Sequence, residues 1–458
     1  MRAARPAHPV LLAMRTHFAN ALYGVLDYVA WPAGMLAVAP LAVRALGVEG
    51  YGIWMVANSA ISIGGIAASG FGDANIRYVA VERAAGNHAA VCRAVRSTLG
   101  IHLALGSALA LAGWLAAPAL TGRLIGSASG LRGDCVWSLR IACVLLLVRA
   151  LESVCISTQR AFERYGAAVR ISVAGRLLGL AAAAIVPLLR PSVTSVLLAA
   201  AAISSGSLWM QLSQLRRLLQ IPALTPRFDR EATKALLGFG KFTWCQAVSA
   251  LLVGQLDRLV TGAALGAAAV SSYAMCAQLS QPVYGITAAG LNFLFPRITA
   301  QYTRDDAPNV RRTVLVAIAL NWAAAALGTA GLLLFGHVIL RAWGGPAIAR
   351  AGSPILPIVL CGTALSALSV AGSYAMLAMG RVRIVTWLNL VAGAAMMTAV
   401  FLLLPRYGIR GMALARLVYG PIMLAVYLPL FLHLRRGSRQ RAATPSQEDL
   451  NRASLENA

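Results

Sequence analysis

The segment 313–340, TVLVAIALNWAAAALGTAGLLLFGHVIL, contains no Asp, Glu, Lys or Arg. A helix of about 20 apolar residues crosses the hydrocarbon core of a bilayer, so this segment predicts a transmembrane helix. Similar stretches follow one another through most of the chain, because 59% of its 458 residues are hydrophobic and only 12% are charged. An ordinary soluble domain has about 25% charged residues. We therefore predict an all-α polytopic membrane protein and exclude a soluble enzyme.

Apolar stretches of spanning length, separated by polar or Gly/Pro breaks, predict twelve helices in two groups of six. The groups are 20–43, 51–71, 97–120, 136–157, 167–189 and 192–214, then 242–262, 270–295, 313–340, 353–379, 384–404 and 411–434. We expect two six-helix bundles, 20–214 and 242–434, around a central cavity. Residues 1–19 read as a cytoplasmic lead-in rather than a cleaved signal. Residues 215–241 read as a cytoplasmic linker, and 435–458 as a disordered cytoplasmic tail.

The positive charges predict the orientation in the membrane. With the N-terminus in the cytoplasm, 27 of the 40 Lys and Arg residues fall on the cytoplasmic side and ten on the opposite side. Cytoplasmic loops carry the excess of Lys and Arg, so we expect both termini in the cytoplasm. The same rule and attraction to anionic lipid headgroups account for the formal net charge of +25. A nucleic-acid partner is therefore not expected.

The sequence shows no pattern for metal, cofactor or covalent chemistry. Its seven cysteines and six histidines lack metal-ligand spacing, and neither a nucleophile elbow nor a Walker A loop is present. We expect no catalytic residue, no metal and no cofactor, and therefore no enzyme. Without an ATP site, the driving force for transport would come from an ion gradient or from removal of the product.

The two halves of the chain resemble each other. The segment ALGVEGYGIWMVANSAISIGGIAASGFGDANIRYVA, from residue 45, aligns with ALGAAAVSSYAMCAQLSQPVYGITAAGLNFLFPRITA, from residue 264. Gly70 and Arg77 are seven residues apart, as are Gly290 and Arg297. Six helices per half give both halves the same orientation, as in a parallel repeat about the membrane normal with a cavity between its bundles. Coincidence in a chain rich in Ala and Gly is the alternative.

Three short patterns carry a family resemblance. The turn before the second predicted helix has the form L-G-x-x-x-Y-G, at Leu46, Gly47, Tyr51 and Gly52. The seventh predicted helix contains Q-x-D-R at Gln255, Asp257 and Arg258, followed by Leu265, Gly266 and Tyr273. The eighth ends in a proline, Pro296. In these patterns the chain resembles the bacterial polysaccharide exporters, or O-antigen flippases, of the multidrug/oligosaccharidyl-lipid/polysaccharide superfamily.

The resemblance implies a multidrug-exporter-like fold in the bacterial inner membrane. It implies export of polyprenyl-diphosphate-linked oligosaccharide repeat units for surface polysaccharide synthesis, by alternating access. The expected partners are that substrate and membrane lipid, a polysaccharide polymerase is a further candidate, and the transport unit is expected to be a monomer. Relatives that flip cell-wall lipid precursors carry arginine in the first helix, where this chain has Asp27. Their cationic site therefore does not carry over at that position.

Charged residues inside predicted spans are the first site candidates, because an ionised group in a bilayer needs a partner or an aqueous cavity. Arg176 and Arg416 have no acid within one helical turn in the sequence, so each needs a partner on another helix, cavity water or an anionic ligand. We expect them to line one chamber and to contact the anionic part of the substrate. Arg149 and Glu152 are three residues apart and can pair on one helix face. A structural ion pair and a substrate contact both remain open for them.

Five further residues have two interpretations each. Asp257 and Arg258 are adjacent and should face different neighbours, with capping or snorkelling as the alternative to a site. Arg77 and Arg297, matched by the repeat, are expected to bind the diphosphate at the cytoplasmic mouth, or else to be anchoring charges. Asp27 is expected either to carry a proton or sodium ion, or to be the counter-ion of an arginine.

These residues favour a flippase over two alternatives. Arginine suits diphosphate and uronic acid groups. A cation-coupled multidrug antiporter of the same fold would use Asp27 as its coupling acid, but the charges inside the spans are mostly basic. A membrane-embedded glycosyltransferase or polymerase would need carboxylates and a substantial loop on the outer face, and the longest outer loop has about 15 residues.

Overall fold

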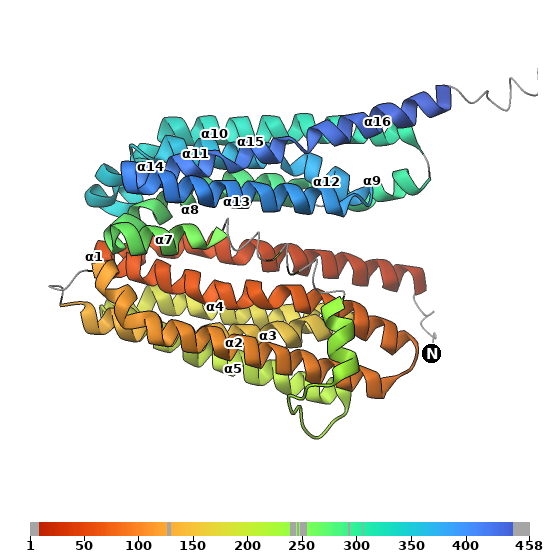
Figure 1. Cartoon of the computed structure of the whole chain (residues 1–458), viewed down its shortest axis with the longest axis horizontal. Coiled ribbons are helices and arrows are strands. Elements are labelled where there is room, and N and C mark those ends of the chain that lie inside the picture. Colours follow the sequence, from red (N-terminus) through yellow and green to blue (C-terminus); the bar gives the residue numbers. More distant parts are fainter. Residues whose placement is uncertain are drawn as a thin grey trace, which may run out of the picture.

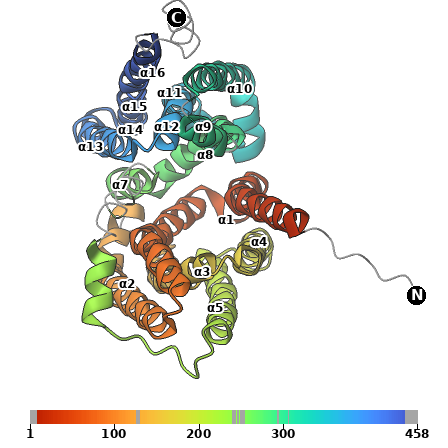
Figure 2. The ribbon, with the colours of Figure 1, turned by 90° about the vertical axis from the view of Figure 1, so that its right-hand side faces the viewer.

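The computed structural model describes residues 9–125, 130–238, 244, 247, 254–291, 294–304 and 306–442, and these residues contain helices and no strand. The N-terminal bundle consists of α1 (Pro9–Ala84), α2 (His88–Ile125), α3 (Arg132–Ala161), α4 (Tyr165–Leu189) and α5 (Val193–Leu219). The C-terminal bundle consists of α7 (Leu256–Leu265), α8 (Ala267–Leu291), α9 (Leu294–Thr303), α10 (Ala307–Gly352), α11 (Leu356–Leu368), α12 (Val370–Ala378), α13 (Val382–Tyr407), α14 (Ile409–Leu417), α15 (Tyr419–Leu424) and α16 (Tyr427–Ala442). Figure 1 shows the two bundles side by side, and Figure 2 looks along their helices.

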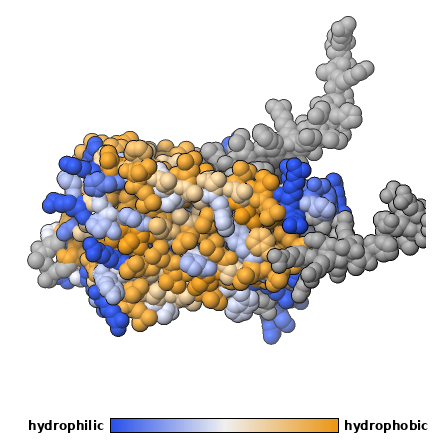
Figure 3. Space-filling model, turned by 90° about the horizontal axis from the view of Figure 1, so that it is seen from above, coloured by the Kyte–Doolittle hydropathy of each residue, from blue (hydrophilic) through white to orange (hydrophobic). Residues whose placement is uncertain are grey.

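The surface and the helix lengths are those of a membrane protein. In the described part of the chain, eight helices are long and apolar enough to span a bilayer. Hydrophobic side chains cover the middle of the molecule and hydrophilic ones gather at its two ends (Figure 3). The predicted all-α polytopic membrane fold is therefore confirmed. The first half of the predicted span 242–262 lies largely outside the described residues.

Three glycines reverse the chain at one end of the molecule, which we call the Gly47 end. Gly47 divides α1 into the first two predicted spans, with φ 73° and ψ 176°. Gly266 joins α7 to α8 with φ 86° and ψ 173°, and Gly345 divides α10 with φ 78° and ψ 176°. These positive φ values favour glycine, which has no Cβ. The aligned residues Gly47 and Gly266 have nearly the same conformation, which supports the predicted repeat.

The segment that we predict as the linker between the bundles contains helical structure and packs on α2. Helix α5 extends to Leu219, and residues 230–238 form a further helix. Between them the chain lies along α2, where the Arg227 amide donates to the Arg96 carbonyl at 3.2 Å and the Asp229 amide donates to Ser97 Oγ at 3.1 Å. The linker therefore packs on the N-terminal bundle through main-chain hydrogen bonds, which have no composition signature.

The C-terminal segment also differs from the expectation of disorder after residue 434. Helix α16 continues to Ala442, because Arg, Gln and Ala in this stretch are good helix formers. The rest of the predicted tail, 443–458, and the first eight residues of the predicted lead-in lie outside the described residues.

Asp134 ties two helices together at the Gly47 end. In the first turn of α3, its carboxylate accepts hydrogen bonds from the Ser192 hydroxyl at 2.5 Å and from the amides of Val193 at 2.9 Å and Thr194 at 3.0 Å. These groups open α5, whose first amides have no partner within the helix. Desolvation raises the pKa of Asp134, but the hydrogen bonds from Ser192, Thr194 and Val193 outweigh it and hold this pKa below its usual value.

Candidate functional site

The two bundles touch through a close main-chain contact between α1 and α8. A Cβ atom on Gly52 would lie 1.9 Å from the Ala267 carbonyl oxygen, so only glycine fits there. Across the same contact, the Ser271 hydroxyl donates a hydrogen bond to the Val48 carbonyl. The repeat aligns Val48 with Ala267 and Gly52 with Ser271, so each half contributes the same pair of positions. The contact is therefore symmetric about the axis between the bundles.

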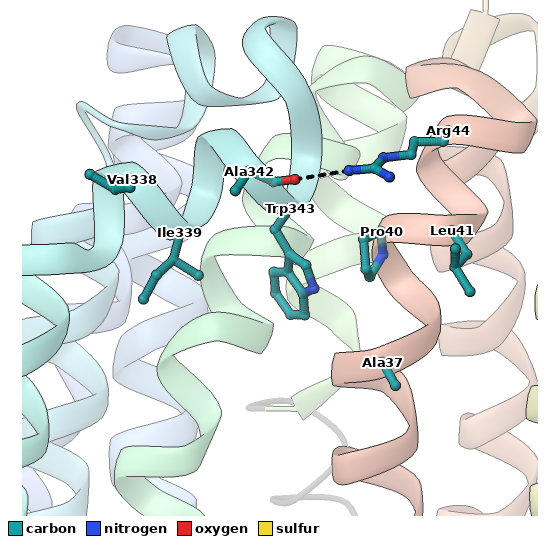
Figure 4. Close-up of a pocket in the computed structure, with 8 residues that line it drawn as sticks. All are labelled: Ala37, Pro40, Leu41, Arg44, Val338, Ile339, Ala342 and Trp343. Carbon is teal, nitrogen blue, oxygen red and sulfur yellow. Dashed lines mark hydrogen bonds between the residues drawn. The ribbon is translucent and has the colours of Figure 1, made fainter.

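Two further hydrogen bonds join α1 and α10, and each ends on a carbonyl that lacks a partner within its own helix. Pro40 has no N–H for the Leu36 carbonyl, and Trp343 Nε1 of the other bundle donates to that carbonyl at 2.9 Å. The Ala342 carbonyl lies in the last helical turn before Gly345 reverses the chain, where carbonyls lack a partner within the helix, and Arg44 Nη2 donates to it at 3.3 Å (Figure 4). We call these two bonds the reciprocal carbonyl caps. They hold the bundles together at the Gly47 end.

A pocket of about 740 Å³ lies inside the N-terminal bundle, between α1, α3, α4 and α5. Its charged lining residues are Arg149, Glu152, Arg160 and Arg176. Neutral polar groups from three helices share the lining: Asn58, Ser62, Ser153 and Ser204. The three arginines outnumber the single acid, so the pocket suits an anionic ligand.

The predicted pair Arg149–Glu152 forms in this pocket. Arg149 Nη1 lies 2.7 Å from Glu152 Oε2, and the Glu152 side chain is 3% exposed. The other carboxylate oxygen, Oε1, is buried without a hydrogen-bond partner among the described residues. Buried polar atoms are nearly always hydrogen-bonded.

The sequence did not predict Arg160 as a site residue, because Arg160 falls after the predicted span 136–157. It lies eleven residues after Arg149, which is about three helical turns, so both arginines lie on the same face of α3. That spacing was the available signal. The electrostatic influence of Arg160 also reaches Asp73 on α1.

Arg416 lies in the other bundle, and it has a partner. Its Nη1 lies 3.1 Å from Asp257 Oδ2 on α7 and 3.1 Å from the Tyr273 hydroxyl on α8. Tyr273 donates to the same Asp257 oxygen at 2.7 Å. Arg416 therefore has its partner on another helix, which is one of the environments that the sequence left open for it, and it is not among the residues that line the pocket with Arg176. The acid comes from 159 residues away, so local sequence could not show it.

Arg258 faces a different neighbour from Asp257, as expected for adjacent helical residues. Its electrostatic influence reaches Tyr51 of the N-terminal bundle, whose hydroxyl donates to Gln278 Oε1 at 3.0 Å. The Nε atom of Arg258 is buried, and no described residue accepts a hydrogen bond from it. Arg258 therefore presents a donor beside the contact between the bundles.

The remaining predicted site residues lie elsewhere. Arg77 on α1 and Arg297 on α9 are both exposed, and the short helix α9 lies at the end of the molecule opposite the junction of α7 and α8 (Figure 1). This placement suits either an entrance or an anchor. Asp27 lies on α1, but its side chain is outside the described residues. The described residues contain no cluster of metal-binding side chains.

Comparison with known proteins matches this architecture to transporters. The fold resembles "Lipid II flippase MurJ, inward closed conformation" with a TM-score of 0.66 and 13% identity, over 92% of this chain and 87% of that one. It resembles an inward-facing "multidrug resistance MATE family transporter of the MOP superfamily" with a TM-score of 0.65 and 15% identity, over 93% and 96% of the chains. A MOP-superfamily transporter from Pyrococcus furiosus, whose binding pocket is described as having reverse polarity, gives a TM-score of 0.56 and 16% identity, over 90% and 96%.

These identities establish the fold alone. Among curated proteins, none matches the sequence significantly. A family model described as "Polysaccharide biosynthesis protein" matches residues 41–325, which is more than half of the chain. The matched region contains the close contact between the bundles, the pocket in the N-terminal bundle, and both Asp257 and Tyr273. The chain therefore belongs to the polysaccharide biosynthesis protein family.

Proposed function

We propose that this protein is a flippase that moves polyprenyl-diphosphate-linked oligosaccharide repeat units across the bacterial inner membrane for surface polysaccharide synthesis. The observation that carries the proposal is the pocket in the N-terminal bundle, where Arg149, Arg160 and Arg176 surround one glutamate. A membrane transporter of a polysaccharide biosynthesis family with such a pocket suits an anionic glycan. Arginine binds carboxylate and phosphate through two parallel hydrogen bonds.

The transport cycle would be alternating access between the two bundles. With both termini in the cytoplasm, the Gly47 end lies at the outer face, and its contacts hold the bundles closed there. The substrate would enter from the opposite end, past Arg77 and Arg297. The prenyl tail would stay in the lipid while the oligosaccharide passes between the bundles.

Asp27 is our candidate for the residue that couples transport to an ion gradient, by carrying a proton or a sodium ion, because it is the only acid in the first predicted span. A cation-coupled multidrug antiporter would also use such an acid. The pocket argues against that function, since its excess of arginines would repel a cationic drug.

Reconstituted transport tests the proposal. Proteoliposomes would carry the purified full-length protein and a fluorescent prenyl-diphosphate-linked disaccharide that contains a uronic acid. The fraction of probe quenched from outside reports flipping. We expect Arg149→Gln and Arg176→Gln each to slow flipping at least tenfold, with Arg176→Lys between wild type and Arg176→Gln. The matched control is Arg170→Gln, an exposed position on the same helix as Arg176.

Two results would overturn the proposal. One is flipping by both glutamine variants at the wild-type rate and with normal protein levels. The other is no flipping by the wild type, together with efflux of a cationic dye such as ethidium under a proton or sodium gradient. That second result would establish the antiporter instead.

A further inference from the structure

A shallow groove of about 500 Å³ lies on the seam between α1 and α10, at the Gly47 end (Figure 4). Its exposed walls are apolar, with Leu41 42% exposed, Val338 64% and Ile339 37%. Arg44 is the one charged residue among the described residues that line it. An exposed apolar groove on a membrane protein faces lipid chains, and a cation at its edge attracts a lipid phosphate.

Arg44 has further N–H groups that could donate hydrogen bonds to such a phosphate. Its side chain is exposed and donates to the Ala342 carbonyl at 3.3 Å, a long hydrogen bond. A guanidinium has five N–H donors. Two phosphate oxygens could therefore bind Arg44 more strongly than the single carbonyl does.

We propose that this groove binds the prenyl-diphosphate end of the transported lipid, with Arg44 on the diphosphate and the apolar walls on the first prenyl units. This inference rests on the proposed function. A prenyl tail that stays in the lipid must remain joined to a headgroup that passes between the bundles. The lipid must therefore leave through a seam, and this groove lies on one.

Binding at Arg44 would also weaken the seam. Phosphate oxygens that engage Arg44 draw it away from the Ala342 carbonyl, which lies in the last turn before the reversal at Gly345 and needs a partner from outside its helix. One of the two reciprocal carbonyl caps is then lost, and only the bond from Trp343 to Leu36 remains. The arriving diphosphate would thus help to open the seam through which its own tail must pass.

Photolabelling tests the proposal in purified full-length protein, held in nanodiscs of phosphatidylcholine. The probe is a benzophenone analogue of farnesyl diphosphate, and mass spectrometry maps the labelled peptides. We expect labelling within 37–44 or 338–343, with suppression by excess farnesyl diphosphate. Arg44→Gln should weaken that suppression about tenfold or more, as loss of a charge-assisted contact implies. Arg44→Lys should lie between, and Arg341→Gln, an exposed neighbour, should match the wild type.

Three outcomes would overturn the inference. Equal suppression in Arg44→Gln and Arg341→Gln would remove Arg44 from the site. Equal competition by farnesol would show that the phosphate is not recognised, and equal competition by phosphatidylglycerol would make the groove a general phospholipid site. Failure here is distinct from failure of the proposed function. Normal flipping without labelling rejects the groove alone, whereas Arg44-dependent labelling without flipping supports the groove and rejects the flippase.

Discussion

The cluster of Asp257, Tyr273 and Arg416 offers the sharpest test of what holds the C-terminal bundle together. Asp257 is 2% exposed and Arg416 is 19% exposed at the side chain. Removing one partner of a buried ion pair leaves the other charge uncompensated, at about 3–5 kcal/mol. Arg416 keeps some access to solvent, so we expect the lower end, about 3 kcal/mol, for Asp257→Asn. This change preserves the shape of the side chain and the contact with Tyr273.

A double-mutant cycle separates the pair from its surroundings. Arg416→Gln alone should also destabilise, and the double variant should be more stable than the two single effects predict, by about 2 kcal/mol or more. The free energy of unfolding would be measured by titrating detergent-solubilised protein with sodium dodecyl sulfate. The control is Arg406→Gln, an exposed arginine of the same bundle, which should stay within about 0.5 kcal/mol of the wild type.

Additive effects within about 0.5 kcal/mol would refute this reasoning. The two charges would then not depend on each other in the folded protein, and Arg416 would return to the list of substrate ligands. A loss of flipping in Arg416→Gln at unchanged stability would point the same way.

Three other changes test the Gly47 end. Gly52→Ala should force the bundles apart, because its Cβ would collide with the Ala267 carbonyl, and spin labels on the two bundles should show a longer distance there. Trp343→Phe keeps a ring but removes the donor to the Leu36 carbonyl, so the same distance measurement should show a closed state weakened by about 1–3 kcal/mol. Asp134→Asn should lower the thermal midpoint at pH 7. Hydrogen bonds hold the folded-state pKa of Asp134 below the usual value for an aspartate. The contribution of Asp134 to stability is therefore present above that usual value and is lost as the pH falls through the folded pKa, so the difference from the wild type should shrink in acid.

The sequence predicted what depends on local spacing and on hydrophobic length. The apolar segments predicted the all-α polytopic membrane fold, and the three-residue spacing of Arg149 and Glu152 predicted their pair. The alignment of Gly47 with Gly266 was visible as a repeat before its conformation was known. Each of these signals lies within one or two helices, where helical geometry fixes which side chains are neighbours.

Contacts between helices that are far apart in the chain could not be predicted from the sequence. Nothing local connects Arg416 with Asp257, so the sequence could not choose among a partner on another helix, cavity water and an anionic ligand for Arg416. The reciprocal carbonyl caps were also invisible, since a proline or a helix end shows which carbonyl lacks an N–H partner but not which side chain will replace it. The path of the linker along α2 depends on the main chain of Arg227 and Asp229 and on the Arg96 and Ser97 groups that they or their neighbours meet there, and no local pattern links these positions.

Each of the reciprocal carbonyl caps and each part of the close contact between the bundles at the closed Gly47 end involves a main-chain carbonyl. The carbonyls of Leu36, Val48, Ala267 and Ala342 all take part, and only Trp343, Ser271, Gly52 and Arg44 have to match them. The pocket in the N-terminal bundle is instead built from side chains. Gate and specificity can therefore diverge separately during evolution: new pocket residues could select a different sugar while the closing contact stays as it is. A transporter arranged in this way can adapt to a new surface polysaccharide through a few substitutions in one bundle.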